Sequence, residues 1–402
     1  MKFTWLAPLW AVILSPLGAL AGDVFEITAH TTSGPPLSKT ASGSSIISLT
    51  EDLVEARGDF KAFDGRALSG SLTYAGMKDA VRFAANADGT NVTLTIPSTG
   101  FSRTFTGASR SDVERQIRDF LKREGAQAWG TFLGKVNEKS MLAVNDGNPQ
   151  SLTATLAAQA FGRFAQRPNM WHQPDAMSGD GELRIDASAG PLNTDDGDGY
   201  AVNVALTTSY DLSDRVGLSL SLPLLYRTFS GAQVYGIGLE VGLPLRLVAQ
   251  GPNDLSWQMT PFFTGGASFS EDFAAGGVVL GGGVSSLLSI PLGGDLTVVV
   301  GNQVSYHGGL PLDVSNVRFD PDVMQYIARN GAQVIFGRDW RIEGSLIWTH
   351  FFREAALEDY FTPSIGVSKA LGQLSGLRVA WSADLGVGYV SHNLSVLLYL
   401  GW

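Results

Sequence analysis

The sequence predicts an all-β transmembrane antiparallel β-barrel of about 12 strands, preceded by a small soluble α+β domain. Three observations support this fold class: long segments in which apolar residues alternate with small or polar ones, a low content of charged residues, and a last segment that alternates up to its final aromatic residue. Charged residues make up 16% of the 402 residues, against about 25% in soluble proteins. Glycine occurs 48 times, above its usual share of about 7%.

The alternation is longest in the segments 216–226, 235–247 and 377–389, where every second residue is apolar or aromatic. These runs exceed the typical globular strand of about 5–6 residues and suit strands that span a membrane, which need about 9–11 residues plus extensions. The apolar face would meet lipid, and the small and polar face would line the lumen. An aromatic girdle is expected near the ends of the runs, at Tyr226, Tyr235 and Tyr389. A soluble β-sandwich is the alternative, but it would need a second sheet to cover each apolar face.

Twelve candidate strands follow from these patterns, an even number as in bacterial single-chain barrels, and ten is the alternative count. They lie near 181–190, 199–210, 215–228, 233–248, 254–268, 275–290, 295–307, 331–338, 340–351, 359–371, 376–389 and 392–402. Every second connection is expected to be a short inner turn. The outer connections are expected to be mostly longer: 190–198, 269–274, 308–330 and 352–358, with a tight one near 390–391. With this parity the barrel starts on the periplasmic side, so the preceding domain is expected in the periplasm or inside the lumen.

The chain divides into four parts. Residues 1–21 have the features of an export signal, because Lys2 precedes an apolar stretch that ends in Ala19-Leu20-Ala21, a small-x-small cleavage pattern. Residues 22–166 are assigned to the soluble α+β domain, in which strand-like runs are followed by three helical segments, the last at 152–164. The polar stretch 167–180 is assigned to a linker and 181–402 to the barrel.

Charged residues at inward positions are the candidate lumen-lining groups. An ionised side chain is costly when it faces lipid and is tolerated in water or in an ion pair. Seven residues meet this criterion: Arg227, Glu240, Arg246, Arg341, Glu343, Arg378 and Asp384. Two interpretations stay open, ion pairs that brace the barrel and a polar passage of mixed charge.

The end of the chain resembles the terminal strand of bacterial outer-membrane β-barrel proteins, both porin-like proteins and the translocator domains of autotransporters. The resemblance is one of pattern: Trp402 is preceded by apolar residues at every second position, Leu394, Val396, Leu398 and Leu400. Phenylalanine is the usual last residue of that family. The resemblance implies recognition by the barrel assembly machinery, export by a cleaved signal, and a place in the outer membrane of a Gram-negative bacterium among lipid and lipopolysaccharide. It leaves the oligomeric state open.

Other functions have less support in the sequence. A net charge of −10 argues against nucleic acid as a partner, because binding to phosphates requires clustered Lys and Arg. The chain has no Cys, its five His show no metal-ligand spacing, and we assign no catalytic residue, metal or cofactor. Pieces of a hydrolase site could come from His350, Asp359, Ser391 and His392. A channel or transport barrel with a periplasmic or plugging domain is the first hypothesis. The alternatives are an autotransporter-like translocator with a short passenger, an outer-membrane enzyme, and a surface adhesin. For the first of these, the resemblance implies a helix inside the lumen ahead of the barrel, and the segment 152–164 is the candidate for it.

Overall fold

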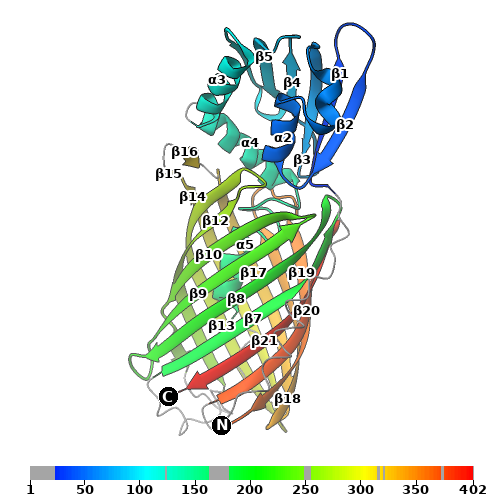
Figure 1. The fold of residues 1–402 in the computed structure, drawn as a ribbon. Coiled ribbons are helices and arrows are strands. Elements are labelled where there is room, and N and C mark those ends of the chain that lie inside the picture. Colours follow the sequence, from blue (N-terminus) through cyan, green and yellow to red (C-terminus); the bar gives the residue numbers. More distant parts are fainter. Residues whose placement is uncertain are drawn as a thin grey trace, which may run out of the picture.

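The chain folds into an N-terminal α+β domain that is stacked on one end of a β-barrel (Figure 1). The computed structural model describes residues 23–122, 125–162, 181–248, 255–314, 317–319, 322–372 and 375–401. The expected export signal, the linker 167–180 and Trp402 lie outside the described residues. No helix in the described part is long and apolar enough to cross a membrane.

The N-terminal domain contains a six-stranded sheet with the order β2-β1-β3-β4-β5-β6. The strands are β1 (Phe25–Thr31), β2 (Ser38–Gly43), β3 (Leu68–Tyr74), β4 (Met77–Ala85), β5 (Asn91–Ile96) and β6 (Phe101–Thr106). The helical elements are α2 (Ile46–Val54), η1 (Gly58–Phe63), η2 (Pro97–Thr99), α3 (Arg110–Lys122) and α4 (Gly125–Lys139).

The two faces of this sheet differ because the side chains of each strand alternate. In β1, Phe25, Ile27 and Ala29 are buried, and they pack with side chains of α2, η1 and α4. The opposite face carries hydroxyl groups that pair across strands, as in the hydrogen bonds Thr28–Thr40 (3.0 Å) and Thr93–Thr104 (2.9 Å). The domain therefore has one apolar face under its helices and one polar face.

The barrel closes through twelve antiparallel strands. The sheet contains thirteen segments, of which β11 continues β10 after Pro244, and the first and last strands pair with each other. The segments are β7 (Gly181–Thr194), β8 (Gly197–Asp211), β9 (Gly217–Phe229), β10 (Ala232–Gly242), β11 (Leu245–Val248), β12 (Ser256–Ser270), β13 (Ala275–Gly293), β14 (Leu296–Leu310), β17 (Met324–Phe336), β18 (Trp340–Phe351), β19 (Asp359–Ala370), β20 (Ser375–Gly386) and β21 (Tyr389–Gly401). A small hairpin, β15 (Leu312–Val314) with β16 (Val317–Phe319), lies between β14 and β17. The predicted fold class and strand count are confirmed.

The outer surface of the barrel is apolar, as the alternation predicts. Along β9 and β10 the leucines and isoleucines at outward positions are exposed, for example Leu224 and Ile237, whereas the alternate residues are mostly buried. Each strand thus presents apolar side chains to the outside and small or polar side chains to the lumen. With the strands paired around the whole circumference, no edge is left open to lipid.

Several sequence expectations are wrong in detail. The strand expected at 331–338 begins already at Met324, so the outer connection expected at 308–330 is shorter, and the tight connection expected near 390–391 lies at 387–388. Tyr389 was expected on the lipid face, but it is buried and points inward, because β20 ends at Gly386 and Tyr389 begins β21 after a turn of two residues. The connection at 190–198 was expected to be long, yet β7 and β8 extend until only Asp195 and Asp196 lie between them. The connection between β14 and β17 is the longest of the outer set, at residues 311–323.

The two ends of the barrel have different neighbours. We call the end under the N-terminal domain the upper rim, and the end where β7 begins at Gly181 and β21 finishes at Gly401 the lower rim (Figure 1). After α4 the chain enters the barrel from the upper rim and forms α5 (Leu152–Phe161) inside it. A segment that the sequence groups with the N-terminal domain therefore contributes a helix to the lumen.

Candidate functional site: the occupied lumen

The helix α5 fills one side of the lumen. It packs against β10, β12, β13, β14 and β17, and its apolar side chains are buried at successive depths. Leu152 and Leu156 contact Leu225 and Val279, and further down Phe161 contacts Val299. The wall makes room for the helix with glycine, since a Cβ on Gly238 would come within 2.8 Å of the Leu156 side chain. The small inward residues of the barrel thus leave the space in which α5 packs.

Polar contacts fix the rotation and depth of α5. Gln159 Nε2 donates to Ser221 Oγ at 2.7 Å, and an Arg227 guanidinium nitrogen donates to Thr155 Oγ1 at 2.9 Å. On the other side of the helix, Gln303 Nε2 donates to the carbonyl of Ala157 at 3.0 Å. A buried polar group that loses its hydrogen-bond partner costs free energy. These hydrogen bonds therefore favour the observed position of α5 over positions shifted along the lumen.

A buried carboxylate holds the segment that leads into α5. The Asp146 carboxylate accepts hydrogen bonds from Thr153 Oγ1 at 2.5 Å and from Gln325 Nε2 at 3.4 Å. Burial raises the pKa of Asp146 to about 6, and the two donors and the charge of Arg353 offset this only in part. Next to it, Ser268 Oγ donates to Asn145 Oδ1 at 2.6 Å. The entry segment is therefore tied to β12 and β17 by polar groups.

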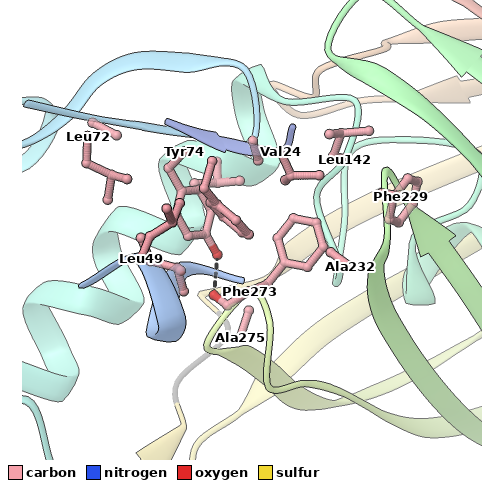
Figure 2. Close-up of a cluster of buried hydrophobic side chains, with 14 of the residues drawn as sticks. Val24, Leu49, Leu72, Tyr74, Leu142, Phe229, Ala232, Phe273 and Ala275 are labelled. Atoms are coloured by element: carbon pink, nitrogen blue, oxygen red, sulfur yellow. Dashed lines mark hydrogen bonds between the residues drawn. The ribbon is translucent and has the colours of Figure 1, made fainter. Parts of the chain in front are cut away.

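The N-terminal domain is docked on the upper rim through an aromatic cluster (Figure 2). Phe273, from the turn between β12 and β13, lies against Phe25 and Tyr74, with ring centroids 5.3 and 6.2 Å away. The Tyr74 hydroxyl donates to the Phe273 carbonyl at 2.5 Å, and Trp129 Nε1 donates to the carbonyl of Ala274 at 3.0 Å. Burial raises the pKa of the Tyr74 hydroxyl well above its usual value, so it stays a donor. The hydrophobic core of the domain is thus continuous with the rim.

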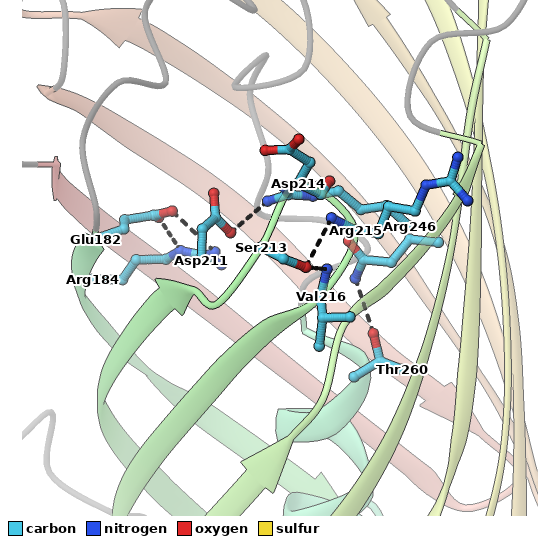
Figure 3. Close-up of polar contacts among 10 residues, drawn as sticks. Glu182, Arg184, Asp211, Ser213, Asp214, Arg215, Val216, Arg246 and Thr260 are labelled. Atoms are coloured by element: carbon cyan, nitrogen blue, oxygen red, sulfur yellow. Dashed lines mark hydrogen bonds and ion pairs between the residues drawn. The ribbon is translucent and has the colours of Figure 1, made fainter.

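Ion pairs line the lower part of the barrel. Glu182 pairs with Arg184 on β7, and an Arg246 guanidinium nitrogen lies 2.5 Å from Asp211 Oδ1 at the end of β8 (Figure 3). Glu343 on β18 pairs with Arg378 on β20, and both side chains are buried. The first pair lies within β7, the second joins β8 to β11, and the third joins β18 to β20 across β19.

The seven predicted lumen residues all lie at inward positions. The structure brings Glu343 and Arg378 together, and it places Arg227 against α5 and Arg246 at the lower rim. Arg341 donates to the Arg338 carbonyl at 3.0 Å, Glu240 is buried, and Asp384 accepts from Thr362 Oγ1 and Ser391 Oγ, both at 2.8 Å. Whether they shape a passage stays a prediction. The terminal-strand residues Leu394, Val396, Leu398 and Leu400 lie at outward positions of β21, which pairs with β7 and closes the barrel, and their role in assembly is also still a prediction.

Sequence reasoning missed several buried inward residues of the barrel and the polar contacts of α5. Arg184, Arg329 and His307 are buried on the inward face and follow the same parity that identified the other charges. Arg329 was missed because residues 308–330 were expected to form a loop, and for Arg184 and His307 the mixture of small and polar residues in their strands hid the pattern. Gln159 and Thr155 could not be found by parity, because they belong to α5.

The wall opposite α5 is less tightly packed. Inward residues of β12, β14 and β17 that face the helix are buried, among them Thr264, Gln303 and Gln333. Inward residues of the other wall are partly exposed to solvent and carry small polar side chains: Ser188, Asn203, Ser364, Ser382, Asn393 and Ser395. The helix is therefore off-centre, with a polar, solvent-reachable strip beside it.

The residues considered for a hydrolase site do not come together. Ser391 faces the lumen and donates to Asp384, whereas His350 lies on the outer surface, where its Nδ1 is 2.9 Å from Asp359 Oδ1. His392 also faces outward and stacks on Trp381. Within the described ranges no group of three or more His, Asp or Glu could hold a metal ion.

A closed barrel with an apolar exterior and a helix through its lumen defines the class: this is a transmembrane β-barrel with an occupied lumen. No family profile matches the chain, and no curated protein matches it. Among solved structures it is similar to the translocator domain of autotransporter NalP from Neisseria meningitidis (12% identity, 62% of this chain and 96% of that chain, TM-score 0.43). It is also similar to an outer membrane channel from Pseudomonas putida F1 (15%, 55% and 95%, TM-score 0.43) and to the transport unit of the autotransporter AIDA-I from Escherichia coli (11%, 70% and 99%, TM-score 0.41). These are likenesses of fold alone.

Proposed function

We propose that this chain is an outer-membrane translocator-type barrel that carries its own N-terminal domain across the membrane and keeps it docked on the extracellular rim. The observation that carries the proposal is the path of the chain. The domain is bound to the upper rim, α5 descends through the lumen, and the barrel begins at the lower rim, where it also ends. The described residues therefore place the domain at one rim, a helix inside the lumen, and the start of the barrel at the other rim.

The lengths of the connections between strands support the assignment of sides. Bacterial barrels have short periplasmic turns and longer extracellular loops. The lower-rim turn between β17 and β18 has three residues, whereas the longest connection between described strands, with the hairpin β15–β16, lies at the upper rim. The upper rim is then extracellular. The periplasmic placement of residues 22–166, the simplest expectation from the sequence, would require the opposite insertion.

Labelling of single cysteines tests the proposal, because the natural chain has none. Ser102→Cys lies on the exposed edge strand β6 of the domain, and Asp214→Cys lies in an exposed lower-rim turn. In intact cells a bulky, membrane-impermeant maleimide should label Ser102→Cys only. Asp214→Cys should react only after the outer membrane is permeabilised. The reverse pattern would reject an extracellular domain.

A channel with a plug is the second candidate, and the polar strip opposite α5 favours it. Its side chains are hydroxyls and amides, with the inward carboxylates of Asp186 on β7 and, nearer the upper rim, Asp384 on β20. Such a strip would suit small polar solutes or water rather than apolar compounds.

A further inference from the structure

The lipid-facing surface of the barrel is interrupted at one place by polar side chains. Ser286 on β13, Asn302 on β14 and Asn330 on β17 are direct neighbours in the register of the sheet, Ser286 opposite Asn302 and Asn302 opposite Asn330. All three point outward. Asn302 lies between the exposed Val300 and Val304, and Asn330 is partly exposed. We call these three residues the polar row.

The depth of the polar row makes it unusual. The rings of Tyr306 and Tyr326, which are tilted relative to each other with centroids 5.0 Å apart, lie four residues above the two asparagines on the same strands. With a rise of about 3.3 Å per residue and a tilt of about 40°, the row lies roughly 10 Å below these rings, near the middle of an apolar band about 25 Å tall. At comparable depth the outward positions of β9, β10 and β21 carry Leu, Ile and Val.

The two amides of the polar row have no partner among the residues that the structure describes. Ser286 Oγ accepts a hydrogen bond from Trp257 Nε1 at 3.0 Å. The side chains of Asn302 and Asn330 make no hydrogen bond to any of the described residues. Because hydrocarbon offers no donors or acceptors, a primary amide at this depth is costly unless a protein partner provides both.

We infer that the wall β13–β18 is a homodimer interface, in which the polar row of one barrel meets the polar row of a second copy. A primary amide is both donor and acceptor, so two asparagines facing each other across a two-fold axis satisfy one another. An axis along the membrane normal also places the two rows at equal depth. Small outward residues beside the row, Ala332 and Gly344, let two barrel walls approach.

Disulfide cross-linking tests the interface in the full chain. Near a two-fold axis, equivalent residues of two copies face each other, so Asn302→Cys should form a covalent dimer when membranes or dilute proteoliposomes are oxidised. Leu222→Cys is the matched control, because it is an exposed outward residue on β9, on another wall. It should remain monomeric. A monomeric Asn302→Cys, or a cross-link to a different protein, would overturn the inference.

A second variant separates the interface from folding. In the double variant Asn302→Leu with Asn330→Leu, the outer surface becomes uniformly apolar, so the barrel should still show its heat-modifiable gel shift. Its dimerisation in liposomes, measured by energy transfer between labelled copies, should weaken at least about tenfold. A folded double variant that dimerises as well as the natural chain would also overturn the inference.

Discussion

At the scale of single residues, Asp146 shows how burial couples the entry segment to pH. Its pKa is raised to about 6 in the folded chain, so the folded state binds the proton more tightly than the unfolded state does. Stability from this group is therefore fully present below about pH 4 and is lost as pH rises through about 6. At roughly 1.4 kcal/mol for each pKa unit, the difference between these limits is about 3 kcal/mol.

Asp146→Asn should remove this pH dependence, because an amide resembles the protonated carboxyl. The expected result is a shallower change of unfolding free energy between pH 4 and 6, measured by urea denaturation in detergent micelles or liposomes. Asp214→Asn, in an exposed turn, is the control and should keep the natural slope. An unchanged slope in Asp146→Asn would show that other buried groups account for the effect.

At the scale of secondary structure elements, α5 is held by apolar burial, so a charge at its centre should dislodge it. In Leu156→Asp the new carboxylate would lie against Leu225 and Val279 in a dry contact. Burying an unpaired charge costs several kcal/mol, so α5 should be displaced from its packing position against the barrel wall. Conductance of the purified barrel in planar bilayers should then rise several-fold above that of the natural chain.

The control for this experiment is Leu212→Asp, at an exposed leucine of a lower-rim turn. Both variants should keep the heat-modifiable gel shift, because neither residue lies in the paired strands. If Leu156→Asp is folded and conducts like the natural chain, α5 does not limit the current and the docked domain is the dominant barrier.

The strands were predictable from the sequence because lipid on one side and the lumen on the other impose a period of two on every strand. The prediction failed at Tyr389, where a two-residue turn keeps the apolar alternation running from β20 into β21. The helix α5 was predictable as a helix from its periodicity, and only the resemblance to autotransporter translocators suggested a place in the lumen, since Leu152 and Leu156 would suit a soluble core equally well. The alternation along each strand identified the charged residues that face the lumen. It could not show which of them form ion pairs, because Glu343 and Arg378 pair across the intervening strand β19.

At the scale of the whole molecule, the domain and the barrel share one hydrophobic core, so they should unfold together. Phe273 belongs to the barrel by sequence, yet its side chain is buried among Phe25, Tyr74 and Phe229. Val24, Leu142 and Ala232 extend the same cluster across the junction. The domain should therefore be more stable on the rim than away from it.

Phe273→Ala tests this coupling. Loss of a buried phenylalanine costs about 3–5 kcal/mol, and here the loss falls on the junction, where the Tyr74–Phe273 backbone contact would also loosen. We expect calorimetry to show two separate transitions in place of one, and limited proteolysis to cut between α4 and α5 at residues 140–151. Phe352→Ala, at an exposed phenylalanine of another upper-rim loop, should retain a single transition. If Phe273→Ala also unfolds in one step at a slightly lower temperature, the entry segment and α5 alone are enough to join the domain to the barrel.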